Sequence, residues 1–157
     1  MKVKGKNPHT GDEYQVIIND VDRGFIDSML TFEMTKNKVQ QVIGNLNVSA
    51  DIKQLLYSFS KATIAIGENI LNIGRKIIDF ICKVFTEYPS ASFGMIFGAI
   101  AGALIGSIPI LGLILGPIFT PIAIALGLVN GVYHDYQDKA LERKIIEINT
   151  KFSPLEN

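Results

Sequence analysis

The longest regular pattern of apolar positions in the chain runs from residue 52 to residue 84. Apolar side chains recur there at alternating steps of four and three, which is typical of a heptad seam along one helix. Ser49 is the predicted N-cap and Asp51 lies in the first turn. Gly67 and Gly74 beside the seam would permit close helix approach. The helix packs either on its own chain or between subunits. The seam consists of Ile52, Leu56, Phe59, Thr63, Ile66, Ile70, Ile73, Ile77, Phe80 and Val84.

A weaker helical pattern comes before this segment. Residues 1–10 are predicted to form a basic, irregular tail, and the T-x-x-E spacing of Thr10–Glu13 suits a capping box. Apolar residues then recur at steps of three, four or seven, which favours a helix from Tyr14 to about Ile43. Gly24 weakens this interpretation, and a strand over residues 14–18 is an open alternative.

The segment from Tyr88 to Tyr133 contains no charged residue. A helix needs about 20 apolar residues to cross a bilayer, so this segment is long enough for two crossings. Pro109 near its middle, together with the glycines and prolines that follow, indicates a bend. The pattern predicts a transmembrane hairpin, with a first span at Phe93–Ile108 and a second at Leu111–Tyr133.

Glycines recur at every fourth position of the first span, as consecutive G-x-x-x-G units. In lipid, association between helices depends on close backbone approach, which a face of small residues allows. We predict that this glycine zipper assembles a homo-oligomer; a hairpin packed only against itself is the alternative. The predicted packing positions of both spans are Gly94, Gly98, Gly102, Gly106, Gly112, Gly116, Gly127 and Gly131.

The zipper of residues 94–106 resembles that of glycine-zipper membrane proteins. The order of amphipathic helices, charge-free hairpin and amphipathic helix looks like that of helical pore-forming proteins and of the small two-span membrane effectors of bacterial anti-phage systems. This second resemblance is one of layout and carries no residue-level motif. It implies a protein that forms a pore or perturbs a membrane.

Basic residues flank the charge-free segment on both sides and are absent from its turn. Because such residues stay on the cytoplasmic side, both termini are predicted to be cytoplasmic, at the bacterial inner membrane. Tyr88, Tyr133 and Tyr136 are the predicted anchors at the membrane interface. The flanking basic residues are Arg75, Lys76, Lys83, Lys139, Arg143, Lys144 and Lys151.

The last part of the chain continues the four-three spacing on a charged helix that ends before Pro154. This helix can pack against the long helix of residues 52–84. The predicted fold is therefore all-α. It comprises a cytoplasmic helical region for assembly or sensing at 1–90, a transmembrane hairpin at 91–133, and an amphipathic helix and tail at 134–157. The apolar positions of the last helix are Leu141, Ile145, Ile148 and Phe152.

Charge and cysteine content narrow the classes of partner. The 157 residues include 15 Lys plus Arg and 15 Asp plus Glu, so the formal net charge is zero. A neutral chain without a basic block argues against nucleic acid as a partner. Cys82 is the only cysteine, which excludes a disulfide framework. Lys2, Lys4 and Lys6 could touch anionic lipid headgroups, although most such tails are merely solvated.

No catalytic motif is present: the sequence has no P-loop, G-x-S-x-G, H-E-x-x-H or paired cysteines. His134 and Asp138 are four apart, but two ligands do not make a metal site. We therefore predict no enzyme, no cofactor and no metal.

The predicted function is an oligomeric membrane protein that forms or gates a pore, or otherwise perturbs the inner membrane. Its predicted partners are the lipid bilayer and further copies of itself, with a cytoplasmic protein as another candidate. The alternatives are a membrane-anchored adaptor whose helical bundle binds a protein, and a helical toxin that inserts conditionally.

Overall fold

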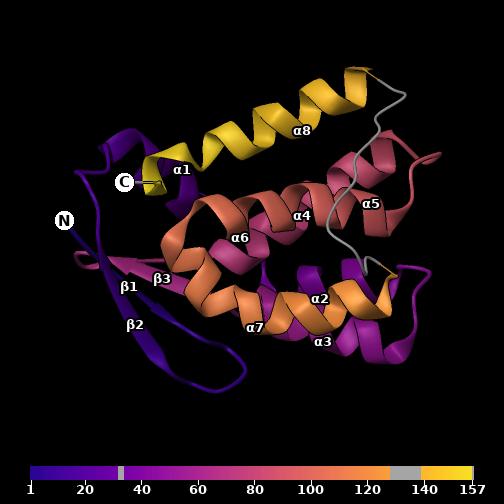
Figure 1. Ribbon diagram of the computed structural model, residues 1–157, viewed down its shortest axis with the longest axis horizontal. Helices are drawn as coiled ribbons and strands as arrows, with labels where there is room; N and C mark the ends of the chain where they lie inside the picture. Colours follow the sequence, from indigo (N-terminus) through magenta and orange to yellow (C-terminus); the bar gives the residue numbers. More distant parts are fainter. Residues whose placement is uncertain (32–33, 128–138, 157) are drawn as a thin grey trace.

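The protein has an α/β fold built on an antiparallel sheet. The computed structural model describes residues 1–31, 34–127 and 139–156 (Figure 1). Four strands form the sheet in the order β2-β1-β3-β4, so the predicted all-α fold is wrong. In chain order, the elements are β1 (Lys2–Lys6), β2 (Glu13–Ile17), α1 (Arg23–Leu30), α2 (Lys36–Gly44), α3 (Ala50–Ser60), β3 (Thr63–Ile66), β4 (Asn69–Leu71), α4 (Ile73–Glu87), α5 (Phe93–Phe97), the π-helix η1 (Gly98–Gly102), α6 (Ala103–Ser107), α7 (Pro109–Ala125), α8 (Lys139–Lys151) and the short 3₁₀ helix η2 (Ser153–Leu155).

The N-terminal segment, predicted to be an irregular tail, is the strand β1. Its alternation of lysines with Val3 and Gly5 is the two-residue period of a strand. The predicted capping box is also wrong, because Thr10 lies in the hairpin loop and its hydroxyl accepts from the Asp12 N–H at 3.3 Å. Gly11 has a φ of +82° in this loop, which suits glycine. The alternative of a strand near residues 14–18 is confirmed by β2.

The long helix predicted over residues 52–84 is interrupted by a β-hairpin. Its start is confirmed, because the Ser49 hydroxyl caps α3 by accepting from the Ile52 N–H at 3.3 Å. After α3 the chain forms β3 and β4, with Gly67 at a φ of +62° between them. The β-branched alternation of β3 favours a strand, and a left-handed turn residue cannot continue a helix.

The helix α4 begins directly against the end of α3. The Gly74 N–H donates to the Ala62 carbonyl at 3.0 Å. A Cβ on Gly74 would collide with the Phe59 carbonyl oxygen, so this close approach requires glycine. The predicted close contact at Gly74 is therefore real, and it lies between two helices of one chain.

The charge-free segment does fold as a helical hairpin. The predicted bend is confirmed, because Ile108 leaves helical geometry and Pro109 begins α7. However, no helix in the described residues is long and apolar enough to cross a membrane. The prediction of two spans is therefore wrong, and so are the predicted inner-membrane location, the topology and the membrane functions that depended on them.

The hairpin is apolar because it forms the centre of the domain. Most of its large aliphatic side chains, such as Ile110 and Ile114, are buried, whereas Gly106, Pro117 and Pro121 lie on its outer side. Only the large side chains need to be covered by other elements.

The sheet is covered on one face by the helices. The helix α7 packs on β1 and β2, α4 packs on β3, and α1 contacts β4. Figure 1 shows α8 on the side of α4 away from α7 and α3. The amphipathic character of α8 and its packing against α4 are confirmed, since Leu141, Ile145 and Ile148 are buried.

Candidate functional site

The other face of the sheet carries a row of lysines. Along β1, Val3 is buried and Gly5 lies against Ile110 and Ile114 of α7. Successive side chains of a strand point to opposite faces, so the lysines between them point away from the helices. Lys2, Lys4 and Lys6 are all exposed. The sheet therefore presents a basic central strand on its uncovered side.

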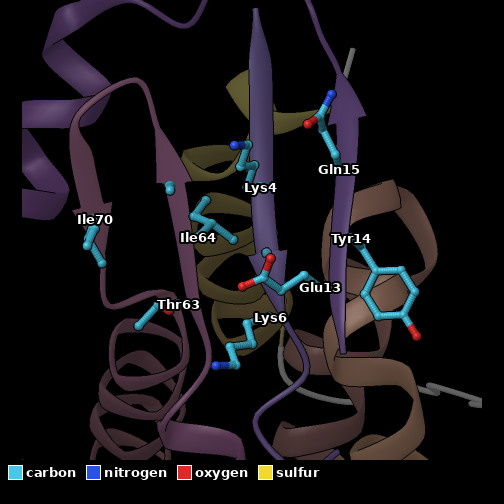
Figure 2. Close-up of a pocket in the computed structure, with 10 residues that line it drawn as sticks. Lys4, Lys6, Glu13, Tyr14, Gln15, Thr63, Ile64 and Ile70 are labelled. Atoms are coloured by element: carbon cyan, nitrogen blue, oxygen red, sulfur yellow. The ribbon is translucent and has the colours of Figure 1, made fainter. Parts of the chain in front are cut away.

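Residues paired across the strands complete this surface. Lys4 pairs with Gln15 on β2 and with Ala65 on β3, and Ala65 pairs with Ile70 on β4. Figure 2 shows Lys4 on β1, Gln15 on the adjacent strand β2, and Ile70 on the edge strand β4. We call this surface the lysine face. It consists of Lys2, Lys4, Lys6, Glu13, Gln15, Ile17, Thr63, Ala65 and Ile70.

The lysine face is hollowed and mixes positive charge with exposed aliphatic side chains. A hollow of about 480 Å³ spans all four strands. The lysine face carries three lysines and one carboxylate, that of Glu13. Ile17 and Ile70, on the two edge strands, are 71% and 66% exposed. Large aliphatic side chains this exposed on a sheet gain free energy when a partner covers them.

The thiol of Cys82 does not have the properties of a reactive nucleophile. Burial, followed by the nearby Asp79 carboxylate, raises the pKa of Cys82 to about 12. Since the thiolate is the reactive form, this thiol stays protonated and inert near neutral pH. Across the described ranges, no group of three His, Cys, Asp or Glu side chains could hold a metal ion.

A second cluster of charges joins α4 to α8. Buried Asp79 forms an ion pair with Lys83 at 3.0 Å. The Nζ atoms of Lys76 and Lys151 lie 4.9 and 5.0 Å from the centre of the Phe80 ring. Burial lowers the pKa of Lys76, and Asp79 opposes that shift. These groups already have partners, and the contact of Lys151 with Phe80 connects α8 to α4.

The predicted zipper does not remain one face in the structure. Gly98 is buried, Gly102 is half-buried and Gly106 is exposed. The π-helix η1 explains this, because a π turn takes an extra residue and rotates positions spaced four apart. Gly94, at the other end, lies beside Leu126 of its own chain.

The predicted packing glycines of the second span have several different surroundings. A Cβ on Gly112 would lie 2.9 Å from the Ile105 carbonyl oxygen, so Gly112 allows the close approach of α6 and α7. Gly116 has open space around it, and Gly127 has a φ of +82° after the end of α7. Gly131 lies outside the described residues. A role of these glycines in self-assembly stays a prediction.

The predicted seam residues are distributed over two helices and a hairpin. Ile70 is exposed on the lysine face, and Phe80 is half-buried between lysines. Thr63 is half-buried, and the other predicted seam residues are buried within this chain. They are Ile52, Leu56 and Phe59 on α3, Ile66 on β3, and Ile73, Ile77 and Val84 on α4.

The predicted interface anchors are only partly described. Tyr88 is half-buried at the end of α4, where it packs against the core. Tyr133, Tyr136, His134 and Asp138 lie outside the described residues.

The lysines of β1 are the residues that the sequence analysis misplaced. We assigned them to a solvated tail or to lipid contact. Lysines at every second position with a valine between them are the signal that could have identified a strand with one basic face.

Comparison of this chain with family models, curated proteins and solved structures finds no match.

Proposed function

We propose that this protein is a non-enzymatic binding protein whose lysine face takes an acidic segment of a partner protein. The observation that carries the proposal is the uncovered sheet face with three lysines on its central strand and one carboxylate. Complementary charge steers such a partner to the surface and sets its orientation.

The exposed isoleucines indicate what else the partner presents. Ile17 and Ile70 lie on opposite edge strands, on either side of the lysines. Covering both would contribute on the order of 2–3 kcal/mol. An acidic segment with aliphatic side chains therefore fits better than a purely acidic one.

Nucleic acid fits this surface less well than a protein does. Sheets that bind single strands stack bases on aromatic rings, and none of the residues that make up the lysine face is aromatic. Tyr14, which also lines the hollow, pairs with Gly5 and so alternates to the other face of the sheet. The whole chain also carries no net charge. Both points favour a protein partner.

The proposal can be tested by calorimetric titration with a short peptide of alternating Glu and Leu. We expect the wild-type protein to bind it, and binding to weaken as salt is raised, because surface charges are screened. The double variant Lys4→Glu, Lys6→Glu should lose roughly tenfold or more in affinity, since each reversed charge costs about 1 kcal/mol.

The matched control is Lys38→Glu with Arg143→Glu, which makes the same change in net charge at exposed positions away from the lysine face. This control should bind the peptide nearly as well as wild type. Equal weakening by the two double variants, or no binding to wild type, would show that the lysine face is not the binding site.

A further inference from the structure

A smaller hollow of about 200 Å³ lies next to the lysine face. We call it the basic pocket. It is formed by α2, α3, the start of β3 and the start of α4, and its cations are Lys36, Lys61 and Arg75. Thr63 lines both this pocket and the hollow on the lysine face, so the two are contiguous.

The charges in the basic pocket are one-sided. No carboxylate lines it, and in the part of the chain that the structure describes none of its three cations forms an ion pair. Arg75 is half-buried, and a guanidinium in that position favours a planar or tetrahedral oxyanion. The lining therefore favours an anion.

The start of α4 adds to this preference. Asn72 is the N-cap of α4 and lines the pocket, yet its side chain makes no capping hydrogen bond. The positive end of this 15-residue helix therefore lies beside the pocket, although its Gly74 N–H already donates to the Ala62 carbonyl.

Size and hydrogen-bond donors narrow the choice of anion. A hollow of about 200 Å³ is smaller than the range of about 300–1,000 Å³ that is usual for drug-sized ligands. It suits a single phosphoryl group. The Thr63 hydroxyl, the Asn72 amide and the forked donors of Arg75 can all donate to phosphate oxygens.

The position of the pocket connects it to the proposed partner. Lys6 pairs with Thr63 across β1 and β3, so the row of lysines leads directly to the basic pocket. We infer that the pocket is a phosphate-monoester subsite, which takes a phosphorylated side chain of the acidic segment bound on the lysine face. This inference rests on the proposed function for the identity of the partner.

The test compares the Glu and Leu peptide with the same peptide carrying one phosphoserine, and includes inorganic phosphate as a third probe. We expect phosphorylation to tighten binding to wild type by roughly tenfold, because charge-assisted hydrogen bonds are strong. Arg75→Gln should remove this gain while leaving the affinity for the unphosphorylated peptide unchanged. Arg75→Lys, which keeps the charge but not the fork, should retain only part of it.

Lys38→Gln is the matched control, because Lys38 lies on α2 with Lys36 but does not line the pocket. It should keep the full gain. If wild type binds both peptides equally, the pocket inference is wrong and the proposed function stands.

If neither peptide binds, the proposed function is wrong, and inorganic phosphate decides on the pocket alone. Changes in amide chemical shift centred on Lys61 and Arg75 that are absent in Arg75→Gln would support a phosphate site. A flat titration would exclude one.

Discussion

The lysine face and the hairpin of α6 and α7 use opposite arrangements of large and small side chains. On the lysine face the long side chains of β1 point outward and Gly5 points inward. On the hairpin most of the large aliphatic side chains point inward, and Gly106 and Gly116 face open space. Long outward side chains can recognise a partner, whereas large inward ones stabilise the fold. Substitutions should therefore separate binding from stability between these two regions.

The largest expected effect is on stability, from Ile114→Ala. Ile114 is fully buried where α7 packs beneath β1. Its truncation should lower the free energy of unfolding by about 2–5 kcal/mol. Urea denaturation followed by circular dichroism measures this. Leu113→Ala is the control, because Leu113 is 41% exposed on the same helix and should lose far less. Similar losses for both variants would mean that α7 does not bury this face.

The next effect probes the contact between the two regions. A Cβ on Gly5 would lie 2.9 Å from Cγ2 of Ile114, so Gly5→Val overpacks the space between β1 and α7. We expect a loss of about 1–3 kcal/mol in the free energy of unfolding. Adding Ile110→Val should restore part of it, because this change removes Cδ1 of Ile110, which would lie 3.0 Å from the new Cβ. Additive losses in the double variant would show that these residues do not touch.

A smaller effect should appear in binding alone. Ile70→Ser on the lysine face should lower the affinity for the Glu and Leu peptide several-fold, since a covered aliphatic side chain contributes about 1 kcal/mol or more to binding. Thermal melting should change little, because Ile70 is already 66% exposed. Ile124→Ser is the counterpart on α7, where Ile124 is 62% exposed. Weaker peptide binding by Ile124→Ser would place the partner on the hairpin instead.

The smallest expected effect has the opposite sign. Gly106→Ala fills open space in α6, where alanine has the higher helix propensity. The free energy of unfolding should rise by up to about 1 kcal/mol. Sedimentation velocity on the same variant tests the predicted self-assembly. A loss of stability together with a smaller particle would indicate that Gly106 lies at an interface between copies.

Local signals in the sequence predicted several elements correctly. Ser49 marked the start of α3, Pro109 marked the bend of the hairpin, and the four-three spacing identified α8. Each of these depends on a few neighbouring residues. Capping, the missing N–H of proline and amphipathic periodicity act at short range, so they can be read without knowledge of the fold.

Tertiary context decided the features that the sequence analysis missed. The heptad spacing continued through β3 and β4 because apolar residues spaced three and four apart can also fall on short strands between helices. The absence of charge from Tyr88 onward fits a membrane span and a domain core equally well. Small residues on one side of α6 and α7 reduced the surface that other elements had to cover. The lysine face depends on cross-strand pairing between residues up to 61 positions apart, as in Lys4 with Ala65, which no local pattern specifies.

The most direct test of the central claim is a map of amide chemical shifts in the ¹⁵N-labelled wild-type protein during titration with the Glu and Leu peptide. We expect the largest changes along β1, β2 and β3, at Lys2–Lys6, Glu13–Ile17 and Thr63–Ile66, while the outer side of α7 stays unchanged. Changes centred on α7, or changes spread evenly over all exposed lysines, would contradict the assignment of the lysine face as the binding site.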